Sequence, residues 1–200
     1  MNTQTKKRLL LIFIAALFFV PLIISFTLFQ QGWRPIGQTN YGTLINPAQS
    51  LTHLSTLTFE TVTDKQPFPL SNLWGKWTLI TVVQEDCVEA CQDTLYKMRQ
   101  VRLALNQNTT RVRRVLLVND PNRLTKPDEI ATVYAGTLLL SGQPAFSTLT
   151  KVLYDSTTDT PYKIYVVDPL GNLMMFYPSD ANPSKMLKDL ERLLRLSTVG

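Results

Sequence analysis

Cys87 and Cys91 are the only thiol residues in this 200-residue chain. They stand four positions apart, where an apolar run ends and a helical pattern begins. Residues at i and i+4 share one helix face, with Cα atoms about 6 Å apart, within reach of a disulfide. Two such thiolates can also hold a soft ion such as Cu(I). The spacing therefore indicates thiol–disulfide exchange or Cu(I) binding at an accessible pair, and two inert buried thiols are the structural alternative.

Carboxylates surround the first cysteine. Glu85, Asp86 and Glu89 oppose formation of the Cys87 thiolate, while a helix N-terminus favours it by about 0.3–1 kcal/mol. Because the two effects are similar in size, we predict that the thiol pKa of Cys87 stays near that of an ordinary cysteine. One histidine in the whole chain excludes a multi-histidine zinc site.

The elements that must position the cysteines alternate between strand and helix patterns. The run WTLITVV, residues 77–83, is β-rich and predicts a buried central strand that ends just before Cys87. The predicted elements are strands over residues 57–62, 77–83, 112–118, 162–167 and 173–177, and helices over residues 87–105, from Thr125 and from Asn182. This order predicts an α/β domain of the thioredoxin-like, three-layer type.

An uncharged apolar segment precedes the domain. Residues 9–29 would span about 31 Å as a helix, close to the thickness of a bilayer core. Lys6, Lys7 and Arg8 precede this segment and predict that the N-terminus stays inside. No cleavage site follows the segment, so we predict an anchor rather than a signal peptide. The expected division is 1–8 cytoplasmic, 9–29 transmembrane, 30–55 a linker that enters the domain through one or two short strands, and 56–200 the domain.

The charge balance gives no support for a nucleic-acid partner. The formal net charge is +5, but three of the positive charges precede the anchor. Residues 9–200 carry 17 basic and 15 acidic side chains, without a basic stripe interleaved with aromatic residues. We therefore expect the membrane and other proteins as partners, and no nucleic acid.

Several short motifs together resemble the Sco/SenC family over roughly residues 55–180. They are Leu73-x-Gly75-Lys76-Trp77, Cys87-x-x-x-Cys91, Asp120-Pro121-x-Arg123-x-Thr125 and Tyr165-x-x-Asp168-Pro169-x-Gly171-Asn172. The resemblance implies a thioredoxin-like fold, a single N-terminal anchor, and work on assembling the copper site of cytochrome oxidase. It also implies that members bind copper through both cysteines and a histidine.

This chain departs from the family at the histidine. Counting back from Pro169, the family's ligand position falls on Thr160, and the only histidine, His53, lies in the linker. The chain is therefore similar to a divergent member that lacks the copper-ligand histidine. Thr160-Pro161 resembles the cis-proline loop of thioredoxin-like oxidoreductases, which favours exchange over metal binding. The alternative is that Pro161 simply begins a strand in trans.

These observations give three functional hypotheses. The first is an assembly factor for respiratory cytochrome oxidase, in the inner membrane with its domain in the periplasm. Cys87 would attack or be attacked, Cys91 would resolve, and Thr160 with Pro161 would shape the groove for an oxidase subunit or another copper or thiol protein. The second is a Cu(I) chaperone that uses the thiolates of Cys87 and Cys91. The third is a non-catalytic, membrane-tethered interaction protein whose disulfide staples the helix start.

Overall fold

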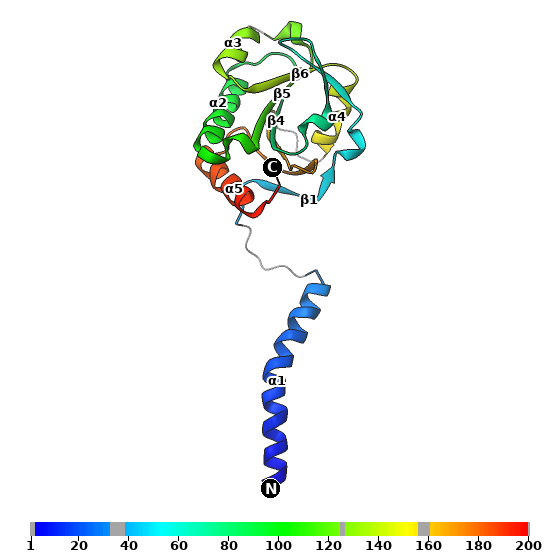
Figure 1. Cartoon of the computed structure of the whole chain (residues 1–200), viewed down its shortest axis with the longest axis vertical. Coiled ribbons are helices and arrows are strands. Elements are labelled where there is room, and N and C mark those ends of the chain that lie inside the picture. Colours follow the sequence, from blue (N-terminus) through cyan, green and yellow to red (C-terminus); the bar gives the residue numbers. More distant parts are fainter. Residues whose placement is uncertain (1–2, 33–38, 125–126, 156–160, 200) are drawn as a thin grey trace. The chain divides into compact units, whose positions relative to one another are not determined.

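The computed structural model describes residues 3–32, 39–124, 127–155 and 161–199. The chain forms two compact units, Met1–Thr39 and Asn40–Gly200. The first contains helix α1 (Thr3–Gln30), drawn in blue in Figure 1. Within the described ranges, α1 alone is long and apolar enough to cross a membrane, as residues 9–29 predicted. The helix continues through Pro21, and the Thr27 hydroxyl donates to the Ile24 carbonyl at 2.9 Å.

The second unit is built around one mixed sheet of eight strands in the order β1-β8-β7-β4-β5-β6-β2-β3. Strands β4, β5 and β6 are parallel, and the other neighbouring pairs are antiparallel. The strands are β1 Thr43–Ser50, β2 Thr58–Thr61, β3 Pro67–Pro69, β4 Trp77–Val83, β5 Val112–Val118, β6 Thr137–Ser141, β7 Ile164–Val167 and β8 Asn172–Tyr177. Strand β1 belongs to the compact unit that begins at Asn40.

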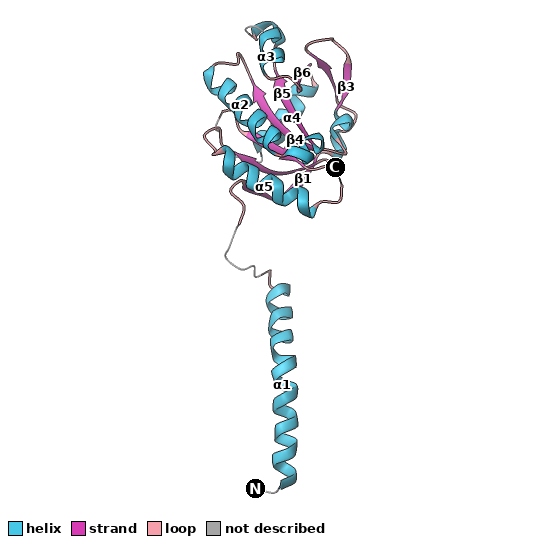
Figure 2. Ribbon diagram, turned by 60° about the vertical axis from the view of Figure 1, so that its left-hand side comes forward, coloured by secondary structure: helices cyan, strands magenta, loops and turns pink. Residues whose placement is uncertain are grey.

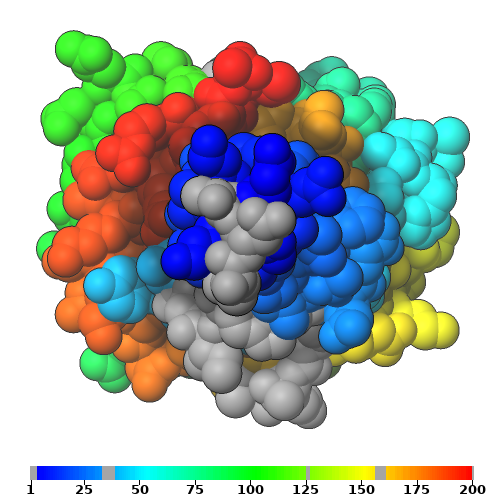
Figure 3. Space-filling model, turned by 90° about the horizontal axis from the view of Figure 1, so that it is seen from below, coloured from blue at the N-terminus to red at the C-terminus, as the bar shows by residue number. Residues whose placement is uncertain are grey.

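Helices cover both faces of the sheet and make three layers (Figure 1 and Figure 2). They are α2 Glu89–Ala104, α3 Pro127–Val133, α4 Ala145–Asp155 and α5 Pro183–Leu196. One core cluster joins α2, α3 and α5 to the sheet, and a second joins α4 to the opposite face. On the face seen in Figure 3, α5 (orange to red) lies beside the green segment of α2. The predicted three-layer α/β architecture is confirmed.

The hydrophobic pattern explains the centre of the sheet. All seven residues of β4 are buried, because the strand has a neighbour on each side and a helix layer on each face. A tight turn joins β7 to β8, with the Gly171 N–H donating to the Asp168 carbonyl at 3.0 Å. Gly171 has φ +86°, and a Cβ there would lie 3.1 Å from the Trp74 ring, so only glycine suits the position.

Parts of the fold differ from the sequence predictions. The pattern did not reveal β6 or α4. Val133 and Leu196, apolar residues of α3 and α5, are 51% and 73% exposed. Met174 and Met175 pack against the same core cluster, although neighbours in a regular strand point to opposite faces. The reason is a bulge, because Val167 pairs with Leu173 while Val166 pairs with Met175.

A buried carboxylate fastens the start of the domain to α5. Asp189 is 5% exposed and accepts hydrogen bonds from the Tyr41 and Gly42 backbone N–H groups at 2.8 and 2.9 Å. The Tyr177 hydroxyl donates to the same carboxylate oxygen at 3.1 Å. Three donors satisfy a group whose burial would otherwise be costly. This contact holds together the first residues of the domain, the end of β8 and α5.

Candidate functional site

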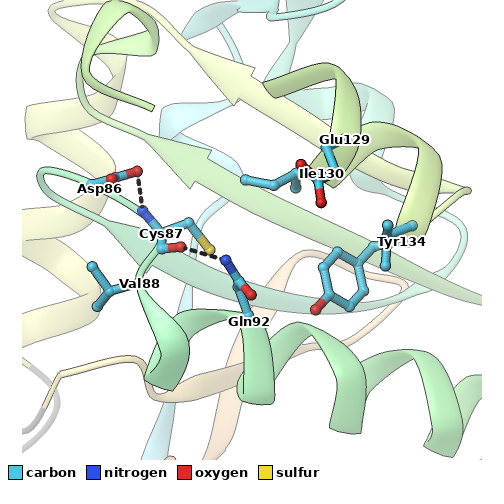
Figure 4. Close-up of a pocket in the computed structure, with 8 residues that line it drawn as sticks. Asp86, Cys87, Val88, Gln92, Glu129, Ile130 and Tyr134 are labelled. Carbon is cyan, nitrogen blue, oxygen red and sulfur yellow. Dashed lines mark hydrogen bonds between the residues drawn. The ribbon is translucent and has the colours of Figure 1, made fainter. Parts of the chain in front are cut away.

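Strand β4 ends four residues before Cys87 and so positions the loop that carries it. Residues 84–88 form the loop between β4 and α2. The Asp86 carboxylate accepts a hydrogen bond from the Cys87 N–H at 2.7 Å, and the Gln92 side chain donates to the Cys87 carbonyl at 3.1 Å. Both bonds are drawn in Figure 4. They hold the backbone of Cys87 in place just before the first turn of α2.

Cys87 and Cys91 are joined in a disulfide, with Cα atoms 5.1 Å apart. Cys91 belongs to the first turn of α2, where its N–H donates to the Val88 carbonyl at 2.9 Å. The pair is more buried than the sequence indicated, since Cys87 is 3% exposed and Cys91 is 0% exposed. Both pack within the core cluster between α2 and the sheet. The expected accessible edge is therefore largely covered, and access depends on the space beside Cys87.

A pocket of about 420 Å³ opens beside this disulfide. It is lined by Asp86, Cys87, Val88, Gln92, Glu129, Ile130, Val133 and Tyr134. Figure 4 shows that Ile130 and Tyr134 reach from α3 and its end towards the loop and α2. Cys87 contributes to this lining, whereas Cys91 does not. An incoming thiol in the pocket therefore meets Cys87 first.

The electrostatic environment of the pocket does not favour a thiolate. Asp86 and Glu129 bring carboxylates to its lining. Burial, and then the charge of Asp93, raises the pKa of the Tyr134 hydroxyl, which therefore stays neutral at physiological pH. Arg123 partly offsets the negative charge, with its Nη1 atom 3.8 Å from the Glu85 carboxylate. The charged groups around Cys87 are thus two carboxylates on the pocket lining and one guanidinium near Glu85.

The other predicted site residues are only partly described. Thr160 lies outside the described residues, and so does the geometry of the peptide bond between Thr160 and Pro161. Pro161 is exposed and lies just before β7. Because Ile80 in β4 pairs with Tyr165 in antiparallel β7, the start of β7 lies near the carboxyl end of β4. The topology thus brings Pro161 to the same end of the sheet as the disulfide.

His53 lies at the other end of the sheet. It is exposed in the 3₁₀ turn Thr52–Leu54 that follows β1. The last residue of β1, Ser50, pairs with Asn172, next to the turn at the amino end of β4. Within the described ranges, no group of three or more His, Cys, Asp or Glu side chains is arranged to hold a metal ion. A site with two cysteines and a histidine therefore does not fit these residues.

Four residues of the pocket lining were not predicted from the sequence, namely Gln92, Glu129, Ile130 and Tyr134. Ile130 and Tyr134 belong to the helix predicted from Thr125 and to the residues that follow it, and nothing in their spacing relates them to Cys87. The pocket arises because α3 and α2 pack on the same face of the sheet. Of these four residues, only Gln92 could have been placed near the cysteines from the sequence, because it directly follows Cys91 on the same helix.

A family model described as "Transmembrane-like, thioredoxin-like, C-terminal domain" matches residues 77–197. Several solved structures share the fold. The apo Sco1 protein of Thermus thermophilus is 23% identical, covers 79% of this chain and 99% of its own, and gives a TM-score of 0.60. Arabidopsis thaliana ScoI with copper bound is 20% identical, covers 70% of this chain and 97% of its own, and gives a TM-score of 0.58. BsSco, in which a disulfide switch was identified, is 17% identical, covers 76% of this chain and 96% of its own, and gives a TM-score of 0.55.

No curated protein sequence matches this chain. The likeness to Sco structures confirms the fold predicted from the motifs, at identities that carry the fold alone. The family model covers more than half of the chain. The protein therefore belongs to the family of transmembrane-like, thioredoxin-like C-terminal domains, and its domain has the fold of the Sco proteins.

Proposed function

We propose that this protein is a membrane-anchored thiol–disulfide exchange factor that acts through Cys87 and Cys91 in the assembly of respiratory cytochrome oxidase. The observation that carries the proposal is the position of the disulfide, at the start of α2 with Cys87 on the wall of a pocket. Thioredoxin-like folds offer a disulfide to partner thiols from this kind of strand-to-helix junction. Pro161, and Thr160 before it, shape one side of the groove that receives the partner.

The exchange has two balanced steps. A thiolate of the partner attacks the Cys87 sulfur, forming a mixed disulfide, and the electron pair of the broken bond leaves on Cys91. A second thiolate of the partner then attacks the sulfur of the partner's first cysteine in the mixed disulfide. This step forms the partner's disulfide and releases Cys87 as a thiolate. The partner's dithiol is oxidised and this chain's disulfide is reduced. In the reverse direction, Cys87 attacks a partner disulfide and Cys91 resolves the intermediate.

The oxidase assignment comes from the relatives in fold. BsSco is described as a member of the Sco family of cytochrome c oxidase assembly proteins, in which a disulfide switch was identified. This chain has a similar fold and a disulfide at the site where the family motif stands. Its substrate is therefore a cysteine pair of an oxidase subunit, or of another copper or thiol protein that serves the oxidase.

The unequal burial of the two sulfurs provides a direct test. Oxidised glutathione serves as the probe on reduced full-length protein in detergent, and mass spectrometry measures the rate of mixed-disulfide formation. Cys91→Ser leaves only Cys87, on the pocket wall, and Cys87→Ser leaves only Cys91, which is 0% exposed. We expect Cys91→Ser to react at least about tenfold faster, because access controls the exchange rate. Equal rates, or a faster Cys87→Ser protein, would contradict the assigned roles.

A cellular test addresses the oxidase itself. The Cys87→Ser/Cys91→Ser protein replaces the wild type in the host, and oxidase activity is measured in membranes. We expect the double variant to fail, while a Ser179→Ala control, distant from the sulfurs in the sequence, supports normal activity. Full activity of the double variant would rule out the thiol mechanism.

We infer the membrane orientation from the charges in the first turns of α1, ahead of its apolar stretch. Lys6, Lys7 and Arg8 stay in the cytoplasm, and the domain lies in the periplasm of an inner-membrane, single-pass protein. An alkaline phosphatase fused after Gly200 reports the location of the C-terminus, because the enzyme matures only outside the cytoplasm. We expect an active fusion, and an inactive one would place the domain on the cytoplasmic side.

Copper transfer is a second candidate, because a relative in fold has been solved with copper bound. Copper is then cargo, and the disulfide must first be reduced so that both thiolates can grip Cu(I). Anaerobic titration of the reduced protein with Cu(I) separates the candidates. One tightly bound equivalent, lost in both single cysteine variants, favours the chaperone. No tight binding leaves exchange as the function of the pair.

A further inference from the structure

A second pocket, of about 370 Å³, lies at the amino ends of the parallel strands. It is lined by Phe68, Lys76, Arg102, Thr110, Val112, Arg113, Gly136 and Leu138. Three of these eight residues are cationic and none is acidic. The proposed exchange chemistry uses none of them.

The topology gathers these cations. Lys76 immediately precedes β4, and Arg113 is the second residue of β5, whose first residue pairs with Trp77 of β4. Arg102 lies in the last turn of α2, and its Nε donates to the Val112 carbonyl at 2.7 Å. Arg113 donates to the Asn72 carbonyl. The side chains of Arg102 and Arg113 are thus held by backbone carbonyls at the amino end of the parallel strands.

A buried guanidinium lies behind this pocket. Arg114 is 2% exposed, and its Nη2 donates to the Ala135 carbonyl at 2.6 Å. Gly136 lines the pocket, and a Cβ at Gly136 would lie 3.5 Å from Arg114 Nη2. The buried cation is therefore separated from the pocket by little more than a glycine.

Buried donors without a partner gather in the same region. Arg114 Nε, Arg114 Nη1, Trp77 Nε1 and Thr137 Oγ1 are four of the five buried side-chain polar atoms without a hydrogen bond in the described residues. Arg114 pairs with Thr137 on the neighbouring parallel strand, so the two side chains share one face of the sheet. A cluster of unsatisfied donors is unusual in a folded core and indicates a missing acceptor.

The local charges are unbalanced as well. Burial, and then the positive charges of Arg102 and Arg99, lowers the pKa of Arg114 to about 10. Burial also lowers the pKa of Arg113. In the part of the chain that the structure describes, Lys97 pairs with Asp93, and Arg123 pairs with Glu85 and Asp120. None of these pairs supplies a carboxylate to the cations around the pocket.

We infer that this pocket binds a phosphate group. Three lining cations, with a fourth behind a glycine, exceed what one carboxylate neutralises, whereas a phosphate carries up to two charges and several acceptor oxygens. Arginine forks match phosphate oxygens, and lysine adds a point charge. The phosphate belongs either to a free phosphate compound or to the headgroup of an anionic phospholipid.

Pyrophosphate tests the first source. Full-length protein in a neutral detergent at low salt is titrated with pyrophosphate by calorimetry. The pocket variant is Lys76→Gln/Arg113→Gln, and the control Lys188→Gln/Arg195→Gln removes two exposed cations from α5. We expect the pocket variant to bind at least about tenfold more weakly than the wild type, and the control to bind like the wild type. Equal weakening in both variants would show only general charge attraction and would overturn the pocket.

Nanodiscs test the second source. The same three proteins are placed in nanodiscs of phosphatidylcholine alone or with phosphatidylglycerol, and the thermal unfolding midpoint of the domain is measured. A rise in the midpoint with phosphatidylglycerol that only the pocket variant loses assigns the headgroup as ligand. Pyrophosphate binding without this rise assigns a free phosphate compound. Absence of both effects overturns the proposal. All three proteins are compared with the disulfide intact, so neither effect requires the exchange reaction of Cys87.

Discussion

The two ends of the parallel strands β4, β5 and β6 differ in chemistry. At the carboxyl ends lies the disulfide, beside a pocket lined by the carboxylates of Asp86 and Glu129. At the amino ends lies a pocket lined by Lys76, Arg102 and Arg113. The seven residues of β4 place about 20 Å between the two ends.

This separation has a consequence for reactivity. Salt screens charges over about 8–10 Å at physiological ionic strength, so the cations at the amino end do little for a thiolate at Cys87. The proposed exchange at Cys87 would therefore proceed without help from the cations at the amino end. Changes at the amino end should therefore alter stability or anion binding, and changes at the carboxyl end should alter thiol chemistry.

The largest effect on stability is expected at the amino end. Asp168 accepts hydrogen bonds from the Leu170 and Asn172 N–H groups and from the Asn172 side chain. Asp168→Ala leaves these donors unpaired and should lower the free energy of unfolding by about 2–4 kcal/mol. Urea unfolding measures the loss, and the reduction potential of the disulfide should stay unchanged. The exposed Asp155→Ala control should change stability by less than about 0.5 kcal/mol.

A smaller loss is expected from reduction of the disulfide. Cys87 and Cys91 enclose a very short loop, with a sequence separation of 4. Loop-closure entropy for so short a loop predicts that reduction lowers the free energy of unfolding by about 2 kcal/mol. Urea unfolding with and without reductant measures this difference, and Cys87→Ser/Cys91→Ser should not respond to reductant. A loss above about 4 kcal/mol would mean that the pair serves mainly as a structural staple.

The sequence predicted the parts of the fold that local pattern determines. The bounds of β4 and β5 agree with the structure, because β4 is a largely apolar run and β5 ends in the apolar run 115–118, and both runs are buried on two faces. Helix α4 escaped prediction since it contains Ser147, Thr148 and Thr150, which are poor helix formers. Its hydroxyl groups bond back to carbonyls of their own helix region, as those of Thr148 and Thr150 do.

Only the site residues that lie close together in the sequence were predicted. The disulfide between Cys87 and Cys91 follows from a spacing of four, but its burial depends on packing between α2 and the sheet. The pocket requires Tyr134, more than forty positions further along the sequence. The pocket around Arg113 likewise combines residues from five separate segments. Tertiary proximity of this kind leaves no periodic signal in a single sequence.

At alkaline pH, one residue at each end of the parallel strands should change the free energy of unfolding, and the two changes should have opposite signs. Burial, and then Asp189, raises the pKa of Tyr177, which lies at the carboxyl end. Above about pH 10 the unfolded chain loses the tyrosine proton while the folded chain keeps it, so stability present below pH 10 is lost as pH rises. Arg114 at the amino end has a pKa lowered from 12.5 to about 10. Between these values the unfolded chain binds more protons, so stability rises with pH.

Two variants separate these opposing contributions. From pH 10 to pH 11, the change in the free energy of unfolding of Tyr177→Phe should be more positive than that of the wild type, by up to about 1.4 kcal/mol. In Arg114→Met it should fall more steeply than in the wild type over the same interval. Urea unfolding at pH 9, 10 and 11 gives the slopes, and the exposed Tyr96→Phe serves as the control. Identical slopes in all four proteins would refute both assignments.

The smallest effect sharpens the comparison at the disulfide itself. Asp86→Asn keeps an oxygen that accepts the Cys87 N–H but removes a negative charge from the pocket lining. Loss of this charge makes the Cys87 thiolate easier to form, so the reduced variant should react with iodoacetamide about 2–5 times faster at pH 7. Asp155→Asn, at the end of α4, should react at the wild-type rate. If Asp86→Asn reacted no faster, the carboxylates would not control Cys87, and access through the pocket would limit its chemistry instead.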